Sequence, residues 1–502
     1  MKKCKILSIA LAVVMLLVLT IPAFAVTPDL SGHDYVAYQI FKGTQIEGDE
    51  DGKLACIEWG DNIDDVALMK VLRKTSGFLA CNTAEDVAKV VSGYGPDSEQ
   101  AREFSKLAYQ YIVGDGIPVT DGTTYTPGYY LVVDVTEFGP GETDTVRNMA
   151  LLQVTGNGDF DIDVKVTVPS VIKEVFEESE SEYQSAADYD IGDQVPFRLT
   201  AQIGEDISAF DTYKLIFHDT LSAGLFFGDG VTDFASTVRV YLDNGLTTKQ
   251  IKNTGTQKYI VDVVGNELTV TLPDVISLIG ATEGDKIVVE YVATLTEEAE
   301  IGVKGNPNEV TLEYSNNPND ETETGKTPKS EVEVYTWGAK INKVTGEEEN
   351  LQPLAGAKFS LFKKEGNKLV EVAKDVEVVP VYDSTNTEII SYTANFKGLD
   401  SGTYVLSETV VPAGYNGIED IEFTITTSFN GEKVATFDVD NGFVVEKNGT
   451  EPTGYVLADI INNEGIILPE TGGIGSTIFY VLGTILLLGS AVVIITKKRV
   501  TE

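Results

Sequence analysis

The residues best suited to chemistry by type and spacing form the pentapeptide LPETG at 468–472, close to the carboxyl terminus. An apolar run from Thr477 to Thr496 follows the pentapeptide, and a basic cluster from Lys497 to Arg499 comes next. The run has about the length that a helix needs to cross a bilayer, and the positive-inside rule would keep the basic cluster in the cytoplasm. The pentapeptide, which consists of Leu468, Pro469, Glu470, Thr471 and Gly472, would then be held outside the cell, beside the membrane.

A pentapeptide, an apolar span and a short basic tail in this order are typical of a cell-wall sorting signal, the substrate of a sortase. The LPxTG pattern alone occurs by chance in many proteins, so the order of the three parts carries the prediction. We therefore expect residues 467–502 to form a sorting signal with a transmembrane segment. The alternative is an ordinary single-span anchor with an incidental LPETG.

The amino terminus predicts export. Lys2 and Lys3 precede an apolar stretch at 6–21, and Ala23-Phe24-Ala25 has the small-residue pattern at which signal peptidase cuts. Residues 1–25 are thus predicted to be a signal peptide, with an uncleaved anchor as the alternative.

Cysteine is scarce in the exported part of the chain. Cys4 lies within the signal segment, so only Cys56 and Cys81 remain, too few for a disulfide framework in a chain of 502 residues. Outside the cell these two could form one bridge, or both could be buried free thiols.

The composition indicates an acidic, globular surface protein. A formal net charge of −41 excludes a generic nucleic-acid binder, because such a charge repels phosphate and keeps neighbouring copies apart. The chain has 42% hydrophobic residues and no low-complexity tract. The length between the two processing signals corresponds to about three domains.

Enzymatic or metal-dependent chemistry has little support in the sequence. His33 and His218 are the two histidines, and neither has a Ser, Cys or metal-ligand partner at a recognisable spacing. Asp159-x-Asp161-x-Asp163 resembles the start of a calcium loop, but Val164 replaces the required Gly. We predict no metal site, no cofactor and no surface hydrolase activity.

Periodicity predicts a mainly β chain whose first region, 26–168, also contains helices. Residues 34–41 and 128–134 alternate as strands do, whereas 83–91 and 98–112 carry apolar residues at helical spacing. Thr83 and Ser98 are the expected N-caps of these helices.

Beyond residue 168 the helical periodicity nearly vanishes. In the middle region, 169–335, strands are predicted at 194–200, 286–292, 310–314 and 331–335, separated by Gly, Asn and Asp turns. This pattern is typical of a β-sandwich. A last region, 336–466, begins near Trp337 and closes with Ile460, Ile461 and Asn462.

Several segments resemble a known family. LAGAKFSL at 354–361 and YVLSETVVPAGY at 404–415 are similar to the CnaB-type immunoglobulin-like domain, the second matching its E-box. PSVIK at 169–173, FHDTLSAGL at 217–225 and PGYYLVVD at 127–134 extend the similarity. From signal peptide to basic tail, the chain resembles the major (backbone) pilins of Gram-positive bacteria. The resemblance implies tandem CnaA/CnaB-type β-sandwiches, the first with helical insertions.

The resemblance also implies amide bonds between lysine and asparagine side chains, formed without an enzyme beside a carboxylic acid. Burial must remove the proton from the lysine and keep one on the acid, and all three groups must touch in the folded protein. In the last region the matching residues are Lys343, the catalytic acid Glu408 and Asn462, with Lys340 as an alternative lysine.

In the middle region the matching residues are Lys173, the acid Asp219 and Asn308. Asn306 is an alternative acceptor, because residues two apart share one face of a strand. In the first region Asp134 occupies an E-box-like position, but no lysine and asparagine partner could be assigned.

Polymerisation in the family uses an exposed lysine on the next subunit. Pilin sortases cleave between the Thr and Gly of the sorting motif, here Thr471 and Gly472, and transfer the Thr to a lysine shortly before the second domain. Lys165, eight residues before Lys173, is the candidate, although its segment lacks the aromatic-Pro-Lys sequence of the best-known pilin motif. The alternative is a strand lysine that covers apolar surface with its stem.

The expected function is therefore a covalently polymerised pilus shaft subunit that supports adhesion. The implied partners are a class C sortase, further copies of the chain, minor or tip pilins, and a housekeeping sortase that attaches the polymer to peptidoglycan. The alternative is a monomeric adhesin whose LPETG is joined directly to the cell wall.

Overall fold

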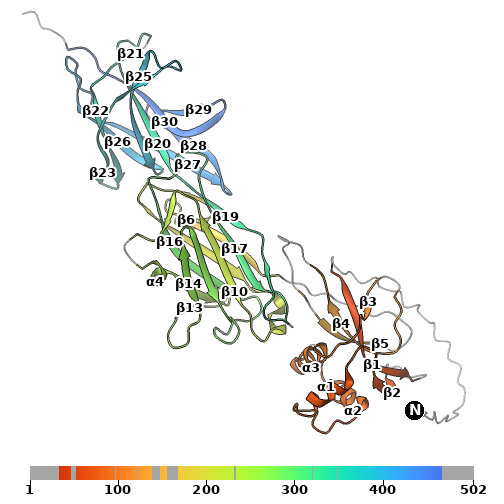
Figure 1. Ribbon diagram of the computed structural model, residues 1–502. Coiled ribbons are helices and arrows are strands. Elements are labelled where there is room, and N and C mark those ends of the chain that lie inside the picture. The colour runs from red at the N-terminus through yellow and green to blue at the C-terminus, as the bar shows by residue number, and fades with distance from the viewer. Residues whose placement is uncertain are drawn as a thin grey trace, which may run out of the picture. The chain divides into compact units, whose positions relative to one another are not determined.

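The computed structural model describes residues 33–46, 53–95, 98–120, 123–137, 147, 149–154, 168–230, 233–318, 320–347 and 349–465 (Figure 1). The chain divides into two compact units. One comprises residues 1–337 with the segments 397–401 and 427–437, and the other comprises 338–396, 402–426 and 438–502. Each sheet is described below within its own part of the chain.

The first region contains one antiparallel sheet with helices packed against it. Its sheet has the order β2 (Leu54–Trp59), β1 (Tyr35–Gln45), β4 (Gly128–Asp134) and β5 (Met149–Val154), and β3 (Ile117–Pro118) pairs with β1. The helices are α1 (Asp65–Leu72), α2 (Ala84–Val91) and α3 (Glu99–Tyr109).

The alternation of β4 assigns its residues to two cores. Leu131 and Val133 join the apolar cluster formed with the helices, whereas Tyr130 and Val132 join a smaller cluster on the other face. Figure 1 shows the three helices together beside these strands. Both faces of the sheet are therefore covered.

Both predicted helix caps are confirmed. The Thr83 hydroxyl accepts a hydrogen bond from the Asp86 N–H, and Asp86 accepts one from the Thr83 N–H, which completes a capping box. Ser98 caps α3 by accepting from the Ala101 N–H at 3.2 Å. These side chains satisfy N–H groups that the first turn of a helix leaves without partners.

The middle region is a sandwich of two sheets. One has the order β14 (Ile260–Val264), β15 (Glu267–Leu272), β10 (Leu215–Leu221), β17 (Asn306–Ser315), β19 (Ser330–Tyr335) and β8 (Ala186–Asp188), with β18 (Thr324–Lys326) on β17. The other has the order β13 (Thr248–Ile251), β12 (Arg239–Asp243), β16 (Lys286–Leu295), β9 (Gln194–Gln202), β6 (Ser170–Glu177) and β7 (Glu182–Gln184), with β11 (Leu225–Phe227) on β16. The short helices η1 (Glu205–Ala209) and α4 (Phe234–Thr237) lie in the connections.

The last region also contains two sheets. One has the order β24 (Val379–Tyr382), β25 (Ile389–Leu399), β20 (Trp337–Thr345), β30 (Glu451–Ile461) and β29 (Val444–Asn448), with β21 (Gln352–Pro353) on β20. The other has the order β23 (Lys368–Glu377), β22 (Lys358–Glu365), β26 (Gly402–Val410), β27 (Ile421–Asn430) and β28 (Lys433–Val439). Its first and last long strands, β20 and β30, are parallel neighbours.

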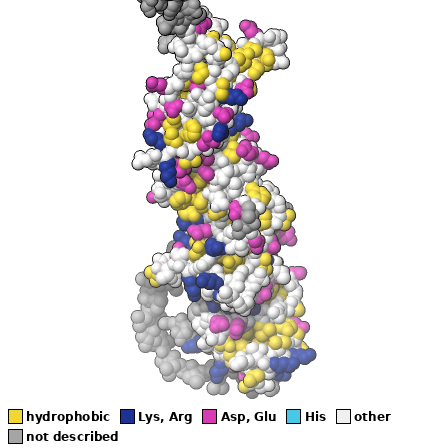
Figure 2. Space-filling view, turned by 90° about the vertical axis from the view of Figure 1, so that its left-hand side faces the viewer, with side chains coloured by type: hydrophobic (Ala, Val, Ile, Leu, Met, Phe, Trp, Pro, Cys, Tyr) yellow, Lys and Arg dark blue, Asp and Glu magenta, His cyan; other side chains and the backbone are white. Residues whose placement is uncertain are grey.

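The mainly β architecture of tandem sandwiches, with helices in the first region, is confirmed. Among the described residues, no helix has the length and apolar content needed to cross a bilayer. The predicted span at 477–496 lies outside the described residues, as does the predicted signal peptide at 1–25. On the face shown in Figure 2, acidic side chains are spread among basic and apolar ones.

Candidate functional site

The middle sandwich brings Lys173, Asp219 and Asn308 together in its interior. Lys173 lies on β6, whose alternate residues Val171, Lys173 and Val175 are buried. Asp219 on β10 and Asn308 on β17 come from the facing sheet, where Leu221 of β10 pairs with Asn308. The period of two in a strand therefore directs three polar side chains into one apolar core.

A hydrogen-bonded cluster joins these side chains to Tyr291 of β16. The Lys173 ammonium donates to Asp219 Oδ2 and, at 3.0 Å, to the Tyr291 hydroxyl. The Tyr291 hydroxyl donates to Asp219 Oδ1 at 2.8 Å, and Asn308 Nδ2 donates to the Tyr291 hydroxyl at 2.8 Å. None of the four residues is more than 2% exposed.

Burial favours the neutral forms of both charged groups. It lowers the pKa of Lys173 to about 8, although the negative charge of Asp219 opposes the shift. It also raises the pKa of the Asp219 carboxyl, opposed by Lys173. The rings of Phe197 and Tyr291 lie 5.3 and 5.4 Å from Lys173 Nζ and exclude water. A neutral amine beside a protonated acid is the combination that amide chemistry requires.

The last region brings Lys343, Glu408 and Asn462 together. Lys343 on β20 pairs with Ile460 on β30, and Asn462 follows directly after β30. Glu408 comes from β26 in the other sheet. The parallel pairing of β20 with β30 thus places the end of the last strand beside Lys343.

The contacts in this second cluster are direct. Lys343 Nζ donates to Asn462 Oδ1 at 2.5 Å and to the Ile460 carbonyl at 2.9 Å, and lies 3.6 Å from Glu408 Oε1. Asn462 Nδ2 donates to the two Glu408 oxygens at 2.9 and 3.1 Å. Burial lowers the pKa of Lys343 to about 8, with Glu408 acting in the opposite direction.

The two alternative residues are engaged elsewhere. Lys340 binds both carboxylate oxygens of Glu446, at 2.7 and 2.9 Å. Asn306 accepts from the Glu300 N–H and donates to the carbonyls of Glu300 and Val334. Among the described residues, Asn308 and Asn462 are therefore the asparagines whose side chains lie beside a buried lysine and a buried acid.

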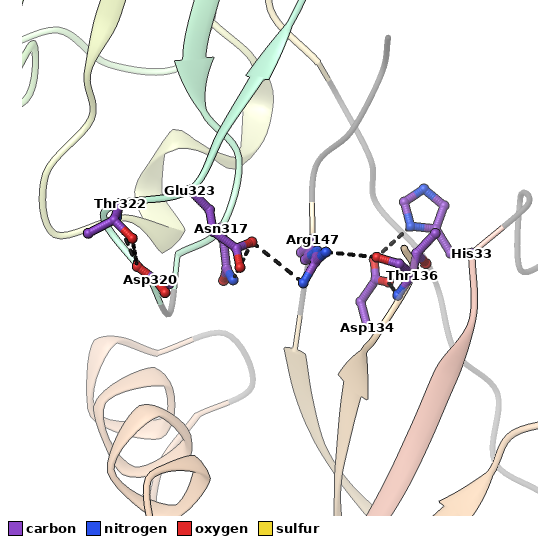
Figure 3. A network of polar contacts seen from close by, with 8 residues as sticks. All are labelled: His33, Asp134, Thr136, Arg147, Asn317, Asp320, Thr322 and Glu323. Carbon is purple, nitrogen blue, oxygen red and sulfur yellow. Dashed lines mark hydrogen bonds and ion pairs between the residues drawn. The ribbon is translucent and has the colours of Figure 1, made fainter. Parts of the chain in front are cut away.

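Asp134 in the first region has a different environment, which Figure 3 shows. Its carboxylate lies 2.6 Å from His33 Nδ1 and accepts from the N–H and hydroxyl of Thr136. Arg147 donates to the Thr136 carbonyl at 2.8 Å. No contact in the described part of this region places a lysine and an asparagine against Asp134.

The suggested bridge between Cys56 and Cys81 is wrong. Cys81 is a free thiol, 5% exposed and packed in the core that the helices form. Cys56 lies on the exposed face of β2. Burial raises the pKa of the Cys81 thiol, which keeps it protonated.

Two groups of predicted residues lie outside the described part of the chain. They are Lys165 and the sorting pentapeptide at 468–472. Conversely, sequence reasoning did not select Tyr291, because an aromatic residue at an alternating strand position is ordinarily part of the core. Its polar neighbours are brought to it by tertiary structure, Lys173 from the same sheet and Asp219 and Asn308 from the facing sheet.

The chemistry open to these clusters is the joining of an amine to a carboxamide. A neutral lysine can attack an amide carbon when an acid assists the loss of ammonia, and folding supplies the proximity. Such a reaction would take place once at each cluster and would use no separate substrate.

Comparisons with known proteins give a family match for the last region and one curated relative. Residues 338–458 match the SpaA family, described as a prealbumin-like fold domain. The trypsin-resistant surface T6 protein of Streptococcus pyogenes serotype M6 is 26% identical over 263 residues, covering 42% of this chain and 48% of that protein. The chain therefore spans about half the length of this curated relative.

Solved structures show a related fold. The T6 backbone pilin of serotype M6 Streptococcus pyogenes gives a TM-score of 0.53 at 18% identity, over 88% of this chain and 98% of that one. The full-length major pilin SpaD of Corynebacterium diphtheriae gives 0.43 at 16% identity, over 86% and 94% of the two chains. The T6 pilin thus shares the fold, whereas the lower score for SpaD supports no further argument.

Proposed function

We propose that this chain is a structural shaft subunit of a covalently polymerised Gram-positive pilus. A class C sortase would join Thr471 of one copy to Lys165 of the next, and a housekeeping sortase would attach the finished polymer to peptidoglycan. The observation that carries the proposal is the pair of buried lysine–acid–asparagine clusters, one in each of two successive sandwiches. The fold shared with a backbone pilin agrees with it.

Each cluster would form one amide bond during folding. In the last region, the Lys343 amine attacks the Asn462 side-chain carbon, and Glu408 first supplies a proton to the leaving nitrogen and then recovers one from the attacking amine. One C–N bond forms, one breaks, and ammonia leaves. In the middle region Lys173, Asn308 and Asp219 have the corresponding roles.

The bonds would strongly restrict the unfolded chain. The two linked residues are 119 positions apart in the last region and 308 − 173 = 135 apart in the middle region. By analogy with disulfide loop closure, a cross-link of this span contributes roughly 4–5 kcal/mol to the free energy of unfolding. This contribution suits a subunit that must remain folded outside the cell.

Boiled SDS extracts of the cell wall test the polymer directly. We expect a ladder of high-molecular-weight species when an antiserum against the chain is used, because amide bonds survive denaturation. Deleting the class C sortase gene should reduce the ladder to monomer. A monomer alone in the wild-type extract would reject the pilus in favour of the monomeric wall-anchored adhesin.

Glu408→Ala should prevent the bond in the last region. Lys343 and Asn462 would remain neighbours, but without the acid the amide nitrogen is a poor leaving group. After the mass change of the substitution itself is subtracted, the intact variant should be heavier than the wild type by one ammonia. Trypsin should also cut the last region sooner.

Glu446→Ala is the matched control, because it removes a carboxylate from the same region that pairs with Lys340 instead. It should retain the loss of ammonia. A Glu408→Ala protein that has still lost the ammonia would exclude Glu408 as the acid.

A further inference from the structure

Tyr291 lies where the two sheets of the middle sandwich face each other. It is on β16, pairs with Phe197 of β9, and points into the core, 2% exposed. Its ring stacks on Phe197 at 5.4 Å and lies 5.7 Å from Phe227. These contacts hold the ring, so its hydroxyl has a fixed position among the reacting groups.

The hydroxyl uses all of its hydrogen-bonding capacity on Lys173, Asp219 and Asn308. A phenol has one hydrogen to donate and two lone pairs that can accept. The hydrogen goes to Asp219 Oδ1, and the lone pairs accept from Lys173 Nζ and Asn308 Nδ2. Tyr291 therefore contacts the nucleophile, the acid and the leaving nitrogen at once.

The last region achieves the same connection without a hydroxyl. There the Glu408 carboxylate reaches Asn462 Nδ2 with both of its oxygens. Asp219 is one methylene shorter, and the described contacts include no hydrogen bond from Asn308 to its carboxylate. The Tyr291 oxygen lies between Asp219 and Asn308, 2.8 Å from a polar atom of each.

We propose that Tyr291 is a catalytic residue of the middle region that relays a proton from Asp219 to the leaving nitrogen of Asn308. This proposal rests on the amide bond put forward above. As the Lys173 amine attacks the Asn308 carbon, Tyr291 gives its own proton to Nδ2 and takes the proton that the neutral Asp219 carries. The attacking amine then returns a proton to Asp219. Ammonia leaves, and both groups end in their starting forms.

Two further observations agree with a relay to nitrogen. Burial, reinforced by the charge of Asp219, raises the pKa of Tyr291 well above its usual value, so the group stays a phenol with a proton to give. In the described structure, Asn308 Oδ1 is buried without a hydrogen-bond partner. The polar assistance in this site is therefore directed at the leaving nitrogen and not at the carbonyl oxygen.

Tyr291→Phe tests the relay while keeping the ring. Using the full mature chain, peptide mapping by mass spectrometry would follow the Lys173–Asn308 linked peptide over time after purification. General acid catalysis typically contributes 10²–10⁴-fold, so we expect the bond to form at least about 10²-fold more slowly. The Lys343–Asn462 peptide in the same sample should stay fully linked.

Tyr189→Phe is the matched control. Tyr189 is another buried tyrosine of the same core, and its hydroxyl donates to the Phe176 carbonyl, away from the cluster. This variant should link as wild type does. Far-UV circular dichroism of both variants would check that the sandwich is folded.

A second variant separates a relay from a packing effect. Adding Asp219→Glu to Tyr291→Phe gives the acid the reach that Glu408 has, and should restore linking. Wild-type protein without the Lys173–Asn308 peptide would reject the bond itself. If the wild-type chain links, two results would overturn the relay. One is a Tyr291→Phe chain that links as fast as the wild type, and the other is a double variant that stays unlinked.

Discussion

Pulled from its two ends in a single-molecule experiment, the last region of the wild-type chain is expected to stay closed, whereas Lys343→Ala should release a long segment. β20 and β30 are parallel neighbours, with Lys343 opposite Ile460 and Asn462 just beyond. A bond from Lys343 to Asn462 would carry the load from the first strand directly to the last.

The size of the release follows from the chain between the linked residues. Residues 344–461 number 461 − 343 = 118 and lie outside the load path while the bond is intact. At about 3.3–3.6 Å per extended residue, their release would add roughly 400 Å of contour length. In the wild type this step should be missing.

Lys340→Ala is the control for this experiment. It removes a lysine of the same strand that pairs with Glu446 and takes no part in the proposed bond, so the step should stay missing. Asn462→Ala should behave as Lys343→Ala does. A wild-type chain that releases the same segment would mean that no covalent bond carries the load.

The strands predicted from alternation and both predicted helix caps are present in the structure, because these features depend on local periodicity. The alternation at 128–134, for example, corresponds to β4 with the same bounds. The parallel pairing of β20 with β30 could not be predicted, since it joins strands more than a hundred residues apart and depends on how the sandwich closes.

The two alternative residues show what alternation can decide. Lys340 and Lys343 are three positions apart and therefore lie on opposite faces of β20. The apolar neighbours Ala339 and Ile341 share the face of Lys343, so this signal was present in the sequence.

Asn306 and Asn308 share one face of β17, and alternation cannot separate them. The register with β10, in which Leu221 pairs with Asn308, places Asn308 near Asp219. Tyr291 was missed for a related reason, because its polar neighbours come from other strands of both sheets. Both cases required information on tertiary structure.

Lys165→Arg should abolish the covalent ladder in cell-wall extracts and leave monomer. A guanidinium stays protonated in proteins, so arginine keeps the charge of the lysine but offers no free amine to the acyl-enzyme. Lys304→Arg, which changes an exposed lysine of the middle region, should leave the ladder intact. A persistent ladder from Lys165→Arg would assign the linkage to another lysine.

Mixing two variants makes this test sharper, because the donor and the acceptor of each link lie on different copies. Lys165→Arg can still donate Thr471 but cannot accept, whereas Thr471→Ala can accept but cannot donate. Co-expressed in a strain without wild-type chain, they should form one product beyond monomer, a dimer, since neither end of that dimer can react further. If another lysine were the acceptor, Lys165→Arg would still polymerise with itself, and a ladder would appear in place of the dimer.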